Sequence, residues 1–239
     1  MRMNGKKDGV LMACYACLLV IGGLLTWLKY DYNAVKMEDV REACGYVSAS
    51  ATPVEAPKIA LTFDDGPSAA WTPALLDGLK ERGVKATFFL IGENADKNPE
   101  IVKRMAEEGH LIGNHTYHHV ELTKVSENEA RLELADTSAV IVRITGKEPE
   151  YMRPPFGAWQ RKLEQEIRML PVLWTIDPLD WTTENQDEIV NKVVTEAEEN
   201  DIILLHDCYK SSVEAGLRII DILQEEGFVF VTVDELLLN

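Results

Sequence analysis

Short apolar runs alternate with longer amphipathic stretches from residue 58 to the C-terminus, and this alternation restricts the fold more than any other feature. The apolar runs are rich in branched and aromatic residues, as are parallel strands that are buried on both faces. They lie at residues 59–63, 86–91, 111–113, 151–152, 172–176, 202–205 and 228–231. Helical stretches separate them, at residues 73–82, 99–108, 127–144, 161–169, 187–199 and 213–226. Strands that alternate with helices in this way predict a parallel α/β domain.

Polar clusters follow most of the predicted strands directly. They lie at residues 64–66, 115–119, 153–157, 177–181 and 206–207. In α/β barrels the loops after the strands converge on one face and build the active site there. An open, doubly wound sheet would gather only some of these loops at its crevice. We therefore predict a distorted, incomplete (β/α) barrel with one site at the carboxyl ends of its strands.

Two histidines four residues apart, His115 and His119 in the segment HTYHH, are candidate metal ligands. On a helical turn this spacing would place both imidazoles on one side, within reach of one ion. With Asp65 they form a set of two histidines and one carboxylate that leaves coordination positions open, as catalytic sites require. A surface pair of histidines is the alternative, and the spacing alone does not distinguish the roles of His118 and His119.

Asp64 and Asp65 follow the first predicted strand and precede Gly66 and Pro67, which indicates a tight turn. Consecutive side chains diverge in such a turn, so one carboxylate could bind a metal while the other faces the attacking water. Adjacent acids in a loop are also ordinary polar turn residues. The pair alone does not decide between these interpretations.

A series of short motifs, each at the end of a predicted strand, makes a resemblance to one family specific. The motifs are TFDDGPS at 62–68, HTYHH at 115–119, RPPFG at 153–157, DPLDW at 177–181 and LLHD at 204–207. In kind and in order they resemble the motifs of the NodB-type polysaccharide deacetylases, carbohydrate esterase family 4. A single short motif arises by chance, but the full ordered set does not. The resemblance extends from residue 58 to the C-terminus.

The resemblance implies a distorted (β/α) barrel that holds a divalent metal ion on Asp65, His115 and His119. Zinc is the expected metal, and cobalt, nickel and manganese also suit this ligand set. The resemblance further implies that Asp64 is the catalytic base and that His206 is the catalytic acid.

Two further residues support the base and the acid according to the same resemblance. Arg153 pairs with Asp64, and Asp180 tunes His206. A simple ion pair between Arg153 and Asp180 that holds two loops together is the structural alternative.

The resemblance also implies a set of substrate-binding positions. Trp181 helps to wall the pocket around the acid, and the backbone amide of Phe156 donates to the oxyanion. Many members of the family have tyrosine at the position of Phe156, but a backbone role does not depend on the hydroxyl. Pro155 and Leu204, which belong to the RPPFG and LLHD motifs, complete the predicted substrate-binding set.

The resemblance implies a metal-dependent hydrolase that removes N-acetyl groups from a polysaccharide containing N-acetylglucosamine and releases acetate. Peptidoglycan is the expected substrate, and chitin-like oligosaccharides are the alternative glycan. Amide hydrolysis needs an activated water, charge stabilisation and a proton for the departing amine, and the chain has a candidate for each. An O-acetyl esterase acting on xylan could use the same residues. A non-catalytic glycan-binding module would have lost catalytic residues, and here all of them are present.

The charge balance excludes nucleic acid as a partner. The chain has 24 basic and 40 acidic residues and a net charge of -16, whereas nucleic-acid binders neutralise phosphates with a basic surface. The sequence predicts no protein partner. The expected partners are the acetylated polysaccharide and, through an N-terminal helix, the membrane.

A nearly uncharged apolar run at residues 9–28 follows Arg2, Lys6 and Lys7. Roughly 20 apolar residues suffice to cross a bilayer as a helix, and basic residues before the run favour a cytoplasmic N-terminus. We expect a cytoplasmic segment at 1–8, a single transmembrane anchor at 9–28, a linker at 29–57 and an extracytoplasmic deacetylase domain at 58–239. A secreted protein with a cleaved signal peptide is the alternative, although no small-x-small cleavage site follows Leu28.

Of the four cysteines, Cys14 and Cys17 fall within this apolar run. Cys44 and Cys208 would then lie outside the cytoplasm, where disulfides form. Whether these two pair is left open, because their separation in the sequence says nothing about their distance in space.

Overall fold

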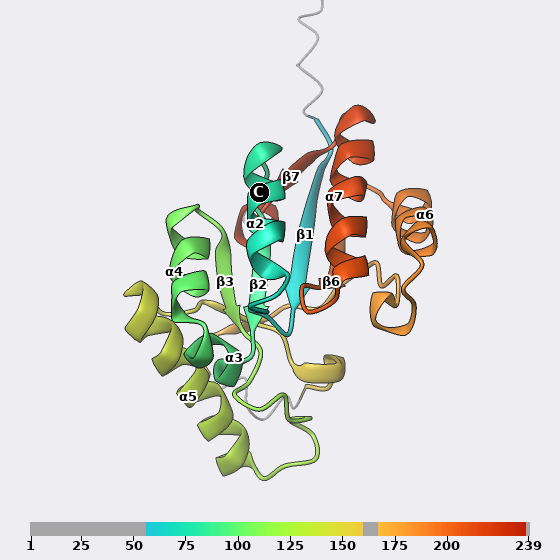
Figure 1. Cartoon of the computed structure of the whole chain (residues 1–239). Coiled ribbons are helices and arrows are strands. Elements are labelled where there is room, and N and C mark those ends of the chain that lie inside the picture. The colour runs from blue at the N-terminus through green and yellow to red at the C-terminus, as the bar shows by residue number, and fades with distance from the viewer. Residues whose placement is uncertain (1–55, 160–166, 238–239) are drawn as a thin grey trace, which may run out of the picture. The chain divides into compact units, whose positions relative to one another are not determined.

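The apolar runs form a parallel sheet and the stretches between them form helices (Figure 1). The structure is a computed structural model that describes residues 56–159 and 167–237. The strands are β1 (Lys58–Asp64), β2 (Thr87–Leu90), β3 (Leu111–Asn114), β4 (Tyr151–Met152), β5 (Leu170–Pro171), β6 (Ile202–His206) and β7 (Val229–Val231). The helices are α2 (Thr72–Glu81), α3 (Gly92–Lys97), α4 (Pro99–Glu107), α5 (Glu127–Thr145), α6 (Gln186–Glu196), α7 (Lys210–Glu225) and α8 (Val233–Leu237).

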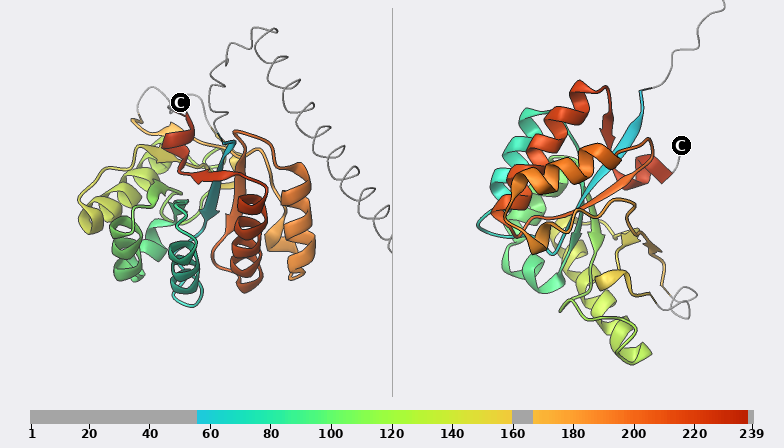
Figure 2. Two further views of the ribbon diagram at one scale, coloured as in Figure 1. Left: turned by 90° about the horizontal axis from the view of Figure 1, so that it is seen from above. Right: turned by 90° about the vertical axis from the view of Figure 1, so that its right-hand side faces the viewer.

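The strand order shows that the sheet winds in one direction. The order is β5-β4-β3-β2-β1-β6, with β7 also paired to β1, and every pairing is parallel. A doubly wound sheet would reverse direction after its first strands, whereas here β1 to β5 follow one another in chain order. Helices α5, α4, α2, α7 and α6 stand in a row along one face of the sheet (Figure 2, left).

The segment that follows β4 crosses from one edge of the sheet to the other. It includes β5, which pairs with β4 at one edge. Further along, the amide of Thr175 donates to the carbonyl of Ile202 at 2.9 Å, and Ile176 forms a parallel bridge with Ile203 of β6. The sheet therefore curls, and this irregular segment links its two edges. The predicted distorted, incomplete barrel is confirmed.

The strand predicted at residues 172–176 is wrong. The paired strand lies two residues earlier, at Leu170–Pro171, and only Ile176 of the predicted run makes a bridge. The guanidinium of Arg153 donates hydrogen bonds to the carbonyl oxygens of Val172 and Leu173, at 3.1 and 3.2 Å. A buried side chain thus uses two backbone groups that would otherwise be available to a neighbouring strand.

The helices largely match the predicted ranges, with two additions. The start of α5 is capped by Ser126, whose Oγ accepts from the amide of Glu129 at 3.2 Å, and its end is marked by Gly146 at φ 74°. Neither α3 nor α8 was predicted, because each is shorter than two helical turns and shows little periodicity. Most of the helix predicted at 161–169 lies outside the described residues.

Within the described residues no helix is long and apolar enough to span a membrane. The predicted anchor at residues 9–28, most of the predicted linker and Cys44 lie outside the described residues. The anchor therefore stays a prediction.

Candidate active site

The carboxyl ends of the strands and the loops after them enclose a cleft with a volume of about 430 Å³. It is lined by Asp64, Asp65, His115, His119, Phe156, Trp174, Asp177, Leu179, Trp181, Leu204, His206 and Tyr209. Most of the predicted site residues are therefore brought to one place. A larger cavity of about 610 Å³ lies beside the starts of β3 and β4 and contains none of them.

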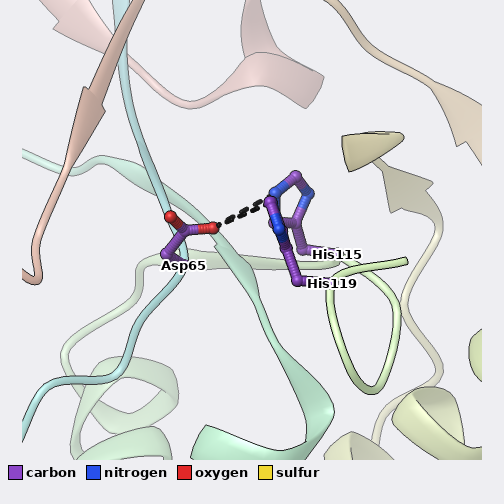
Figure 3. Close-up of side chains that lie close together, drawn as sticks. All are labelled: Asp65, His115 and His119. Carbon is purple, nitrogen blue, oxygen red and sulfur yellow. Dashed lines mark ion pairs between the residues drawn. The ribbon is translucent and has the colours of Figure 1, made fainter. Parts of the chain in front are cut away.

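The three predicted metal ligands converge in this cleft (Figure 3). Oδ1 of Asp65 lies 3.4 Å from Nε2 of His115 and 3.4 Å from Nε2 of His119. All three ligand atoms lie within 4.8 Å of one another. This spacing could accommodate one ion between the three side chains.

Hydrogen bonding indicates that these groups fit a cation. Nδ1 of His115 lies 2.7 Å from the carbonyl oxygen of Arg153. A carbonyl can only accept, so Nδ1 carries a proton, and in the neutral imidazole Nε2 then presents a lone pair to the cluster. Oδ1 of Asp65 is buried and has no hydrogen-bond partner among the described residues. A lone pair and a carboxylate oxygen that face each other without a proton repel, and a divalent cation between them would remove the repulsion.

Burial lowers the pKa of His119, and the neighbouring His115 adds to this shift against the opposing charge of Asp65. A neutral imidazole is the form that binds a metal ion. The surroundings of His119 therefore favour the ligand form of its side chain.

The two histidines do not lie on a helical turn, so helical spacing is not what brings their imidazoles together. Residues 115–119 form an irregular loop after β3. Thr116 and His119 have φ values of 65° and 58° in this loop. Both imidazoles reach Asp65 because of the path of this loop, which contains two residues with positive φ, and not because of a helical repeat.

Positive φ values at non-glycine residues are concentrated around the cleft. They occur at Asp65 (73°), Thr116 (65°), His119 (58°), Phe156 (61°) and Leu179 (56°), and at Asn200 (72°) away from it. Such backbone conformations are uncommon and tend to cluster at functional sites.

Asp64 is held by a fully buried arginine. Nη1 of Arg153 lies 2.8 Å from Oδ1 of Asp64 and 2.7 Å from Oγ of Thr62. The guanidinium also stacks over the ring of Phe89, with 4.3 Å to its centroid. Oδ2 of Asp64 lies 3.7 Å from Nε2 of His115. One carboxylate oxygen is thus fixed by the arginine and the other faces the predicted metal ligands.

His206 is held by a second buried carboxylate. Oδ1 of Asp180 lies 2.7 Å from Nδ1 of His206, and Oδ2 accepts from its backbone amide at 2.8 Å. Burial alone would lower the pKa of His206, but the hydrogen bond to Asp180 and the nearby carboxylates raise the pKa to about 9. Because Nδ1 is occupied, Nε2 is the nitrogen left for the cleft. Arg153 and Asp180 therefore pair with Asp64 and His206 rather than with each other.

The predicted substrate-binding residues lie in the wall of the cleft or behind it. Phe156 and Trp181 are 67% and 58% exposed, which leaves both rings available to a ligand. The Phe156 ring packs edge-on against His119 at 4.8 Å between centroids. Leu204 is buried in the wall. Pro155, which precedes Phe156 in the sequence, is buried but does not line the cleft. The oxyanion role of the Phe156 amide stays a prediction.

Four lining residues were not predicted as site residues: Asp177 and Leu179, which lie in the DPLDW motif, and Trp174 and Tyr209, which lie outside every motif. Tyr209 lies three residues after His206, and their ring centroids are 6.4 Å apart. Its position just after the LLHD motif could have indicated in the sequence that it lines the cleft. Trp174 lies in the irregular segment after β5, where the sequence carries no motif. Only the three-dimensional course of that segment brings it to the cleft.

Cys208 has the character of an inert thiol. Burial and the nearby carboxylates raise its pKa to about 12, and the thiolate is the reactive form. It forms no disulfide within the described residues. Pairing with Cys44 is untested, because Cys44 lies outside them.

Comparison with known proteins gives a consistent result. The family model described as polysaccharide deacetylase matches residues 51–173. A peptidoglycan-N-acetylglucosamine deacetylase of Bacillus cereus is 43% identical over 194 residues, covering 78% of this chain and 70% of that protein.

Two further proteins extend the comparison to solved structures. The peptidoglycan-N-acetylmuramic acid deacetylase PdaC of Bacillus subtilis is 41% identical over 178 residues, which is 74% of this chain and 38% of that protein. The solved structure of PdaC has a TM-score of 0.75 at 40% identity and covers 76% of this chain and 90% of that chain. The Xyl-CE4 domain of a multidomain xylanase from the hindgut metagenome of Trinervitermes trinervoides has a TM-score of 0.70 at 36% identity. The match covers 76% of this chain and 89% of that chain.

Proposed function

The chain belongs to the polysaccharide deacetylase family, and from this premise we propose that it removes N-acetyl groups from N-acetylglucosamine residues of peptidoglycan. Chitin-like oligosaccharides would present the same acetylated sugar. The observation that carries the proposal is one cleft that contains a cluster able to hold a cation, a carboxylate fixed by Arg153 and a histidine paired with Asp180. The names of the Bacillus relatives support peptidoglycan as the glycan.

Asp65, His115 and His119 would hold the metal ion, for which zinc is our first expectation and cobalt, nickel and manganese are alternatives. A divalent ion in such a site supplies Lewis acidity, which polarises the acetyl carbonyl and makes water a stronger acid. The protein contributes the neutral form of His119 and the orientation of His115 through the carbonyl of Arg153.

Asp64 takes the proton of the attacking water in this proposal. Arg153 holds Oδ1 of Asp64 at 2.8 Å, so Oδ2, on the side of the metal ligands, is the oxygen that accepts the proton. A base fixed in this way needs no reorganisation before the transfer. The backbone amide of Phe156 would donate to the oxyanion, and Trp181 and Leu204 would border the sugar.

His206 delivers a proton to the sugar nitrogen as the carbon–nitrogen bond breaks. Asp180 holds its Nδ1 and keeps the imidazole protonated, with the pKa raised to about 9. A bound cation would oppose part of this shift, because like charges disfavour the protonated form.

The second candidate function is O-deacetylation of xylan or another acetylated sugar. The similarity to a domain of a xylanase at 36% identity supports it. A sugar amine must be protonated to leave, however, and the Asp180–His206 pair is suited to that demand. We therefore favour the amide substrate.

Acetate release tests the choice between the two functions. The purified full chain, loaded with zinc, is given N-acetylated peptidoglycan, chitooligosaccharides and acetylated xylan, with Asp65→Ala as the inactive control. We expect acetate and free amines from the first two glycans. Release from xylan alone would sink the N-deacetylase proposal. Elemental analysis of a separate preparation, purified without added metal, identifies the metal.

We also propose that residues 9–28 anchor the chain in the membrane with the catalytic domain outside the cytoplasm. The support is the apolar run preceded by basic residues. The full chain should sediment with membranes and should resist extraction by salt. Recovery in the medium with roughly the first 30 residues removed would favour a signal peptide instead.

A further inference from the structure

A buried carboxylate outside all of the catalytic motifs lies against the loop that carries His115 and His119. It belongs to Glu133 on α5, which is 9% exposed. Its Oε2 accepts hydrogen bonds from the backbone amides of Tyr117 and His118, at 2.9 and 2.7 Å. Its Oε1 lies 2.8 Å from Nδ1 of His118. Glu133 therefore contacts the chain repeatedly between the two predicted ligands.

The loop between the ligands has a backbone that requires support from elsewhere in the protein. Thr116 and His119 both have positive φ, a conformation that non-glycine residues rarely adopt. Two consecutive amides of this loop point at one place and form a concave site for an anion. The carboxylate of Glu133 occupies that site, and hydrogen bonds to a charged acceptor are stronger than those to a neutral one.

Helix α5 also holds the start of the same loop, through Asn114. Its Nδ2 donates to the carbonyl of Leu134 at 2.8 Å and to Oγ of Ser138 at 3.0 Å. Its Oδ1 accepts from the amide of Thr116 at 2.9 Å. The helix thus meets the loop before each of the two histidines. Among these contacts, Glu133 contributes the charged group.

We propose that Glu133 is a positioning residue for the metal ion, whose carboxylate fixes the loop conformation in which His115 and His119 converge on Asp65. The proposal rests on the metal site of the proposed function and gives Glu133 no contact with substrate. Loss of a group that orients metal ligands typically lowers metal affinity by about 10–100-fold. A merely structural role would lower the melting temperature and leave the zinc affinity of the folded protein unchanged.

Zinc affinity, measured by competition with a chromogenic chelator on the full chain, separates these roles. Glu133→Ala removes both carboxylate oxygens that contact Tyr117 and His118, so its zinc affinity should fall by about 10–100-fold. Glu133→Gln keeps the volume and one acceptor oxygen, so its loss should be smaller. Asp136→Ala is the matched control, because Asp136 is an exposed acid on the same helix, and it should bind zinc as the wild type does.

Two further measurements sharpen the test. His118→Ala removes the side-chain contact but keeps both amide contacts, so it should retain most of the zinc affinity. In Glu133→Ala the amides of Tyr117 and His118 should exchange with solvent faster, and excess zinc should restore most of the acetate release. Both results are expected if Glu133 acts by ordering the loop.

Equal zinc affinity in the wild type and in folded Glu133→Ala would overturn the proposal. If Glu133→Ala does not fold, Glu133→Gln decides in its place, and unchanged affinity there has the same meaning. The proposed function fails in a different way. A wild-type chain that binds zinc but releases no acetate from any glycan would contradict the activity, while the affinity series would still test Glu133.

Discussion

His119 and His206 line the same cleft, yet their surroundings shift the two pKa values in opposite directions. Burial lowers the pKa of His119, and His115 adds to this against the charge of Asp65. His206 is also mostly buried, but its hydrogen bond to Asp180 and the surrounding carboxylates raise its pKa to about 9. Two imidazoles in one cleft thus favour different protonation states because one of them has a dedicated carboxylate on Nδ1.

In the proposed function this difference divides the cleft into a metal side, made of Asp65, His115 and His119, and an acid side, made of Asp180 and His206. On the metal side a neutral imidazole is needed, because only an unprotonated nitrogen can bind a cation. On the acid side a protonated imidazole is needed to donate. Surroundings that separate the pKa values of like groups assign them different roles.

The largest expected effect comes from removing the carboxylate of the metal side. Asp65→Ala leaves two imidazoles without their shared anionic partner, so zinc affinity should fall by at least about 100-fold, the upper range for losing a mere supporting group. Turnover should fall to background at equimolar zinc. Metal content and acetate release, measured on one preparation, check this prediction. Full zinc content in Asp65→Ala would show that Asp65 is not a metal ligand.

The neighbouring aspartate should behave differently, although it is adjacent in the sequence. Asp64→Asn keeps the size of the side chain and removes its basicity, so zinc should stay near stoichiometric. The kcat for acetate release should fall by about 10²–10⁴-fold, the usual contribution of a general base. Loss of zinc in Asp64→Asn together with its retention in Asp65→Ala would reverse the two assignments.

Much of this arrangement could be predicted from the sequence, because strand periodicity and the motifs are local signals. The runs that became β1, β2, β3 and β6 were located almost to the residue. The division of labour on each side of the cleft depends on contacts between distant segments. Arg153, for example, reaches back to Asp64 over 89 residues.

The parts that sequence missed have no local pattern. The irregular segment after β5 was predicted as a strand because it is apolar, but the Arg153 side chain occupies two of its carbonyls. The spacing of His115 and His119 indicated a shared ion, but it cannot reveal the positive φ of Thr116 and His119 in the loop that carries them. Glu133 carries no motif, and its role depends on where α5 packs.

A smaller effect is expected on the acid side. His206→Ala should keep zinc near stoichiometric and lower kcat on an N-acetylated glycan by about 10²-fold or more. The loss should shrink on an aryl acetate ester, whose leaving group departs without a proton. Zinc content and kcat on both substrates check this. An equal loss on both substrates would mean that His206 is not the proton donor.

The smallest change tests the source of the opposite pKa shifts. His206 can donate only below its pKa, so activity should fall as pH rises through that pKa. Asp180→Asn removes the charge that raises the pKa, so the alkaline limb of kcat against pH should move to lower pH by about 1–3 units. The drop in kcat at the optimum should be modest, because an amide can still accept a hydrogen bond from Nδ1.

Asp177→Asn is the control for this shift. Asp177 lines the same cleft, but its Oδ1 accepts from the amide of Leu179 at 2.8 Å rather than from His206. General loss of negative charge in the cleft would move the limb equally in both variants, whereas a dedicated partner moves it in Asp180→Asn alone. An unmoved limb in Asp180→Asn would show that His206 does not set it, and the division of the cleft into a metal side and an acid side would then lose its main support.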